Sequence, residues 1–97
     1  MDSDALSAAV VLAIKDCAVP HIDRRKLAQA FGMTQGRLLA ARISALVQEA
    51  VGLPVDWRDM TLEQGVNAIL LRFSDRHPEL SQEALHEIGR CVGWNLR

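Results

Sequence analysis

The three prolines of this chain, Pro20, Pro54 and Pro78, mark places where its regular structure must break. The residue before a proline is pushed out of helical geometry, so a helix has to end before each of them. Between these breaks apolar residues recur at helical spacing, and no segment shows the alternation that indicates a strand. The sequence therefore predicts an all-α fold: a single compact bundle of about five helices with orthogonal packing, in one domain over residues 1–97.

Capping residues predict where the helices begin and end. Asp23, Thr34 and Ser81 have side chains suited to the N-cap, and Thr61 with Gln64 has the spacing of a capping box. The expected helices run from about Asp4 to Ala18, after Asp23 to Gly32, after Thr34 to Val51, after Thr61 to a point before Pro78, and after Ser81 to Gly93. The fourth carries the clearest amphipathic stripe, formed by Val66, Ile69, Leu70 and Phe73.

The two cysteines, Cys17 and Cys91, are far apart in the sequence and form no CxxC pair. We expect neither a disulfide framework nor a zinc site, and interpret both as buried thiols in a reducing compartment. The apolar run Ala8–Ile14 follows acidic residues, Asp2 and Asp4, where a secretory signal would need positive charge. It is also much shorter than the ~20 residues that cross a bilayer. These features predict a cytoplasmic protein.

No set of residues has the spacing of a catalytic or metal centre. The pair Glu83 and His86 resembles one of the carboxylate–imidazole pairs of a di-iron bundle. Such a site needs two of these pairs and two further glutamates. There is no phosphate-cradling glycine loop and no Ser-His-Asp order. Glycines inside the expected helices, Gly36, Gly65 and Gly89, favour close packing instead. We expect no enzyme activity, no cofactor and no metal.

Residues 23–42, DRRKLAQAFGMTQGRLLAAR, have the punctuation of a helix-turn-helix. Small and apolar residues fall where that motif places its contacts: Leu27, Ala28, Gly32 and Leu38. Residues 21–48 hold five basic side chains and one acidic, a local charge of +4 that phosphates would favour. Candidate nucleic-acid contacts are Arg24, Arg25, Lys26, Gln35 and Arg37.

Helical geometry argues against that interpretation. If the second helix docked through Leu38 and Ala45, the face left for DNA would hold Gln35, Leu39, Ala40, Ile43, Leu46 and Val47. Base edges are read by polar side chains, and only Gln35, with Arg37 on its flank, is suitable. Leu39, Ile43, Leu46 and Ala50 are instead expected to form a stripe buried against the first and fourth helices.

The second half of the chain has the opposite charge. Residues 49–97 hold eight acidic side chains and five arginines, a balance of −3, which complements a basic partner such as a nuclease. Trp57, in the loop PVDWRDM, is either an exposed interface anchor or a plug between the third and fourth helices. Trp94 follows a glycine expected to end the last helix, so we expect it to fold back into the core.

The last stretch, MTLEQGVNAILLRFSDRHPELSQEALHEIGRCVGWNLR, resembles small helical immunity proteins of bacterial contact-dependent growth inhibition systems. The turn RHPELSQEAL and the ending GWNLR carry the resemblance, which covers about 40 residues. It implies a cytoplasmic, non-enzymatic protein that binds the C-terminal toxin domain of a cognate effector, commonly a nuclease such as a tRNase. Folds and surfaces vary within this group, so no binding residue is carried over by position.

These observations lead to three hypotheses. The first is an immunity protein that neutralises a basic toxin domain, with a first group of partner-binding residues (Asp56, Trp57, Asp59 and Glu63) and a second (Glu79, Glu83 and Glu87). The second is a small helix-turn-helix DNA-binding regulator that uses the basic candidates above. The third is an adaptor that dimerises through a spare apolar strip of the third helix.

Overall fold

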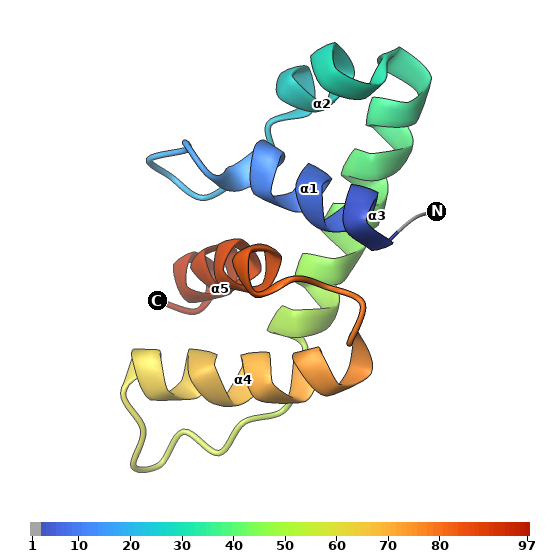
Figure 1. The fold of residues 1–97 in the computed structure, drawn as a ribbon. Helices are drawn as coiled ribbons and strands as arrows, with labels where there is room; N and C mark the ends of the chain where they lie inside the picture. Colours follow the sequence, from blue (N-terminus) through green and yellow to red (C-terminus); the bar gives the residue numbers. More distant parts are fainter. Residues whose placement is uncertain (1–2) are drawn as a thin grey trace.

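The computed structural model describes residues 3–97, so the charge expected at Asp2 lies outside it. The described chain forms five helices and no strand, which confirms the all-α bundle (Figure 1). The helices are α1 (Ser3–Ile14), α2 (Arg24–Phe31), α3 (Met33–Val51), α4 (Leu62–Arg76) and α5 (Gln82–Leu96).

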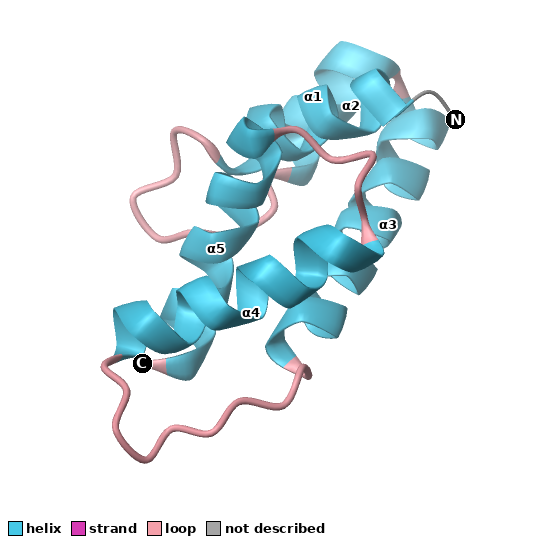
Figure 2. Cartoon of the chain, turned by 60° about the horizontal axis from the view of Figure 1, so that its bottom comes forward, coloured by secondary structure: helices cyan, strands magenta, loops and turns pink. Residues whose placement is uncertain are grey.

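The longest helix, α3, crosses the other helices. In Figure 1, α1, α5 and α4 lie one below another, and α3 runs past all three from the α2 end to the α4 end. The molecule is elongated as a result, with extents of 45 × 27 × 18 Å. The segment between α3 and α4 loops around the end opposite α2 (Figure 2).

The core lies where α5 meets its three neighbours. Phe73, Ile88 and Val92 are completely buried there together with Ile43 of α3 and Val10 of α1. The stripe of α3 formed by Leu39, Ile43, Leu46 and Ala50 is buried as expected, and α5, which the sequence did not suggest, supplies much of its cover. The strip is therefore buried within the fold and does not form an exposed surface for a homodimer.

Three of the expected N-caps are present. The Asp23 carboxylate accepts hydrogen bonds from the amides of Arg25 and Lys26. Thr61 and Gln64 form the complete capping box. The Ser81 hydroxyl accepts from the amide of Ala84 at 3.1 Å. These caps satisfy amides that a helix leaves free at its start.

The N-cap expected at Thr34 is wrong. Helix α3 begins at Met33, and only Gly32 lies between it and the end of α2 at Phe31. Gly32 separates the two helices and has a φ of +89°, a conformation that glycine adopts without steric cost. The Gly36 amide already donates to the Gly32 carbonyl, so Thr34 lies inside the first turn.

Helix α1 ends at Ile14, four residues before the expected Ala18. The Arg90 side chain of α5 binds the chain just after this end, where its guanidinium donates to the carbonyls of Lys15 and Cys17 at 3.1 and 2.7 Å. It also pairs with Glu87 at 2.8 Å. Carbonyls left free by the end of the helix are thus satisfied by a neighbouring helix.

The end expected at Gly93 is also wrong, because α5 continues to Leu96. A Cβ at Gly93 would lie 3.8 Å from Val66, so the position is ordinary helix packing and not a left-handed cap. Trp94 consequently stays on the helix surface, 37% exposed, with the Arg97 guanidinium 3.4 Å from its ring centroid. The expectation that Trp94 folds into the core is therefore incorrect.

Both cysteines are buried and free, as expected. Burial raises the pKa of the Cys91 thiol to about 11, since the apolar surroundings disfavour the thiolate. The geometry gives this thiol a packing role.

Candidate protein-binding surface

Trp57 packs on α4 and remains exposed, which decides between the two interpretations of this residue, an interface anchor or a plug in the core. Its ring lies on Gly65, where a Cβ would overlap the ring atoms, yet 40% of the residue remains accessible. It is therefore not a plug between α3 and α4. The indole is thus held against the helix while part of the residue remains accessible.

The loop that carries Trp57 is held at several points. The guanidinium of Arg72 donates to the Pro54 carbonyl at 2.7 Å. Asp56 accepts from the Arg58 amide at 3.2 Å and forms an ion pair with the same residue. A turn follows, in which the Met60 amide donates to the Trp57 carbonyl. These bonds fix the backbone of the loop on either side of Trp57.

A hollow of about 530 Å³ opens beside the indole and is lined by Trp57, Leu62, Leu96 and Arg97. We call these four residues the Trp57 surface. Met60 and Leu62 in the same region are also substantially exposed. Trp and Arg are the residue types most often found as energetic centres of protein interfaces, so the arrangement suits recognition of another protein.

The first group of sequence-based candidates flanks Trp57 and Leu62 in the sequence, but none of its carboxylates lines the hollow. Asp59 and Glu63 are exposed, and within the described chain neither forms an ion pair. Asp56 is exposed but pairs with Arg58 at 3.5 Å. Two carboxylates without a counter-ion therefore adjoin Met60 and Leu62 in the sequence, which suits a polar rim beside an apolar contact.

The second group of candidates is less available. Glu87 is almost buried and pairs with Arg90. Glu79 lies 3.2 Å from Nδ1 of His77, whose Nε2 lies 2.7 Å from Glu49. Hydrogen bonding to its own backbone, and to a smaller extent to His77, lowers the pKa of Glu79. Glu83 is exposed on α5.

The basic candidates gather at the other end of the molecule, where α2 meets α3. Arg24, Arg25, Gln35 and Arg37 are exposed, and Lys26 lies 4.0 Å from Asp16. Leu38, expected to contact the preceding helix, is 58% exposed, so the helix-turn-helix docking contact is not formed. The two helices instead meet at Gly36, where a Cβ would lie 2.8 Å from the Ala28 amide nitrogen.

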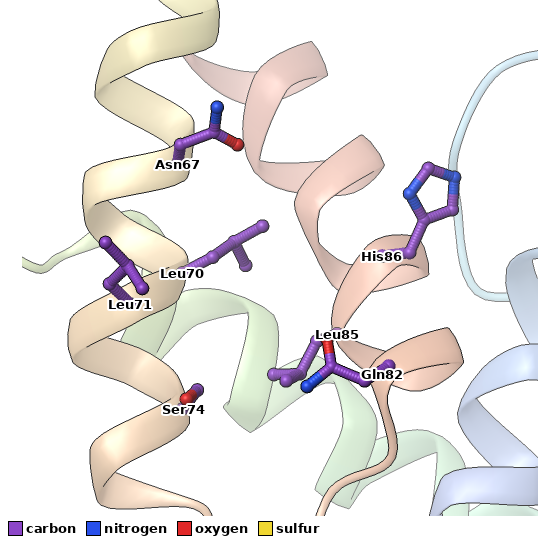
Figure 3. A pocket seen from close by; sticks show the side chains of 7 residues that line it. All are labelled: Asn67, Leu70, Leu71, Ser74, Gln82, Leu85 and His86. Carbon is purple, nitrogen blue, oxygen red and sulfur yellow. The ribbon is translucent and has the colours of Figure 1, made fainter.

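A further hollow of about 410 Å³ lies between α4 and α5 (Figure 3). Its sides are formed by leucines and uncharged polar groups: Asn67, Leu70, Leu71, Ser74, Gln82, Leu85 and His86. His86 borders this hollow, but no carboxylate does. Across residues 3–97 no group of three or more His, Cys, Asp or Glu side chains is arranged to hold a metal ion.

Sequence reasoning found Trp57 and its acidic neighbours but missed Gly65, Leu62, Leu96 and Arg97. A glycine inside α4 signalled a close neighbour without saying which residue it was. The last turn of α5 was missed because the helix was expected to end at Gly93.

Comparisons with protein-family models, with curated proteins and with solved structures found no match. In the part of the chain that the structure describes, no helix is long and apolar enough to cross a membrane.

Proposed function

We propose that this chain is a cytoplasmic immunity protein that binds a basic toxin domain, such as a nuclease, through the Trp57 surface. One observation carries the proposal: an indole held on Gly65 while 40% of the residue stays accessible. A rigid, half-exposed aromatic side chain loses little conformational freedom on binding, so it is an efficient anchor.

Charge supports a basic partner. Asp59 and Glu63 have no counter-ion among the described residues, and they adjoin the exposed Met60 and Leu62 in the sequence. A partner with cationic groups around its contact patch would pair with them and be steered toward the surface. Domains that bind nucleic acids carry such cationic groups because they must hold phosphates. The resemblance of residues 60–97 to immunity proteins points to the same class.

A DNA-binding regulator is the weaker alternative. Exposed Arg24, Arg25 and Arg37 suit phosphate contacts. The side of α3 that would have to read base edges is largely buried, and Gln35 alone offers an amide there. We therefore favour a protein partner.

Neutralisation of a captured partner tests the proposal. The partner is identified by affinity purification from native lysate, then expressed in a sensitive host alone or with this chain. We expect growth arrest by the partner alone and recovery with the wild-type chain. The variant D59R/E63R should fail to restore growth, whereas D16R/D75R, which makes the same charge change at exposed sites elsewhere, should succeed. A partner that is harmless when expressed alone would contradict the immunity role.

A further inference from the structure

The end of the molecule opposite the Trp57 surface carries cations that the fold itself does not use. Arg24, Arg25 and Arg37 are exposed, and no carboxylate in the described chain lies within 4.0 Å of them. Arg58, Arg76 and Arg90, by contrast, each pair with a carboxylate. Lys15, Arg42, Arg72 and Arg97 also lack a carboxylate partner among the described residues, but Arg24 and Arg37 line one hollow where α2 meets α3, and Arg25 is the neighbour of Arg24 in α2.

The start of α2 carries more positive than negative charge. Asp23 caps the helix and supplies the negative charge that a helix N-terminus favours. Arg24 and Arg25 follow it in a first turn that contains no acidic residue. Two exposed arginines therefore lie beside a single carboxylate that is already hydrogen-bonded to backbone amides.

Apolar side chains lie among the arginines. Met33 is 70% exposed and Leu38 is also largely exposed. A shallow hollow of about 130 Å³ between the helices has Arg24 and Arg37 on its rim and Ala28, Gly36 and Ala40 among its lining residues. We call Arg24, Arg25, Met33, Arg37 and Leu38 the basic corner. Exposed apolar groups beside cations fit an acidic protein surface with apolar residues better than a phosphate chain.

Such a surface exists at the other end of the same chain. Asp59 and Glu63 are carboxylates without counter-ions, next to the exposed Trp57, Met60 and Leu62. We propose that the basic corner of one copy docks on the Trp57 surface of a second copy. Asp59 and Glu63 would pair with arginines of the basic corner, whereas Arg97 of the Trp57 surface adds one like charge that opposes the contact. Each end also supplies exposed apolar side chains.

The two surfaces lie at opposite ends of the molecule, separated by the length of α3 (Figure 1). Docking of one end on the other is a heterologous contact, so it produces head-to-tail chains and not a closed twofold dimer. The end face is narrow, 27 × 18 Å across, so the contact belongs to the small end of the range of protein interfaces. The association is weak and depends on salt.

This association does not depend on the immunity role, but it gives the Trp57 surface a second occupant. A tight partner that binds the Trp57 surface would displace the second copy. Head-to-tail chains therefore form only when the partner is absent.

Sedimentation of the whole chain tests the proposal, at roughly 10 to 500 µM protein and at about 0.02 and 0.5 M salt. At low salt we expect the average mass to rise with concentration above the 10.7 kDa of one chain, and at high salt to remain there. R24E/R37E removes the basic corner and D59N/E63Q removes the acidic rim, so each variant alone should stay monomeric.

A mixture of these two variants gives the sharpest result. One retains an intact acidic end and the other an intact basic end, so together they should form a 1:1 dimer that cannot extend. The variant K15E/R42E changes the net charge as much as R24E/R37E does and should associate like the wild type. Far-ultraviolet circular dichroism checks that all variants are folded.

Three outcomes would overturn the proposal: a monomer at every concentration in low salt, association that survives both double variants, or equal loss of association in K15E/R42E. Binding of single-stranded polydeoxyadenylate that R24E/R37E abolishes, in a chain that stays monomeric, would assign the basic corner to nucleic acid. Because no step uses the toxin partner, these results do not depend on the test of the immunity role.

Discussion

At Gly65 the absence of a side chain decides how Trp57 is presented. The indole lies where a Cβ would be, so this position fixes the orientation of the exposed face of the ring. We call the space above Gly65 the Gly65 notch. Neither residue has this role alone, because without the Gly65 notch the Trp57 side chain would be mobile on its loop. The candidate site is therefore a pair of residues eight positions apart.

Substitution of Gly65 by alanine should release the indole. We expect Trp57 emission to shift to longer wavelength, measured with Trp94 changed to Phe so that a single tryptophan reports. Helix propensity gains about 1 kcal/mol from the change, which offsets part of the lost packing, so the domain should remain folded.

Gly93→Ala is the matched control for that experiment. It also lies inside a helix, but its Cβ would make an ordinary contact with Val66 at 3.8 Å. Its spectrum should equal that of the parent. An unchanged spectrum in Gly65→Ala would show that the indole is not held by the Gly65 notch.

The Cys91 thiol provides a pH-dependent test of the core. Desolvation raises its pKa from 9.0 to about 11, and the thiolate is the form that reacts with alkylating agents. At about pH 8 the thiolate fraction in the folded chain is therefore roughly 100-fold below that of the unfolded chain. With Cys17 changed to Ser, we expect iodoacetamide to react at least that much more slowly with folded protein than with protein in urea. Equal rates would contradict burial of this thiol.

Among the elements, the contact between α2 and α3 depends on backbone proximity. Gly36 faces backbone atoms of Leu27 and Ala28, where a Cβ would lie 2.8 to 2.9 Å away. Backbone cannot move aside as a flexible side chain can. The short helix α2 and the basic corner are thus positioned by one glycine.

Gly36→Ala should destabilise the domain by about 1–3 kcal/mol, the usual effect of overpacking, despite the gain in helix propensity. Urea unfolding measures the change. The free energy of unfolding of Gly93→Ala should match or exceed that of the parent. If both alanine variants were equally stable, the close approach of α2 to α3 would be refuted.

Local sequence signals predicted the starts of the helices better than their ends. N-caps act within three residues, so Asp23, Thr61 and Ser81 could be read directly. The carbonyl at the end of α1 accepts from Arg90, a residue 76 positions from Ile14, and no local pattern reports such a contact. Two glycines, Gly32 and Gly93, look alike in sequence, but only Gly32 adopts a positive φ.

The exposure of Leu38 shows the same limit for the candidate sites. Its position suggested a helix-turn-helix contact, but helical spacing allows either of two faces to be buried. The face with Leu39, Ile43 and Leu46 was chosen because it meets α1, α4 and α5 together. Which face of α3 is buried follows from the total apolar area removed from water. That area depends on all the helices of the bundle and not on α3 alone.

For the molecule as a whole, the elongated bundle separates two kinds of surface. Trp57 and the exposed carboxylates Asp59 and Glu63 belong to the segment between α3 and α4 and the start of α4, whereas Arg24, Met33 and Arg37 line one hollow where α2 meets α3. The charge polarity of the sequence predicted this separation in outline, because α3 carries the chain from one end to the other. Which carboxylates remain free was not predictable, since Glu87 and Asp56 form ion pairs within the fold.

The most direct test of the central claim is quantitative affinity purification from nuclease-treated native lysate. The baits are the wild-type chain, W57A/D59R/E63R, and the control D16R/D75R, and the bound proteins are quantified by mass spectrometry. A binding surface centred on Trp57 predicts one basic protein at near-equal stoichiometry with the wild type and the control, reduced at least tenfold with the triple variant, as expected for loss of about 1.4 kcal/mol or more of binding energy. Equal recovery with all three baits, or recovery of DNA without a protein from untreated lysate, would contradict it.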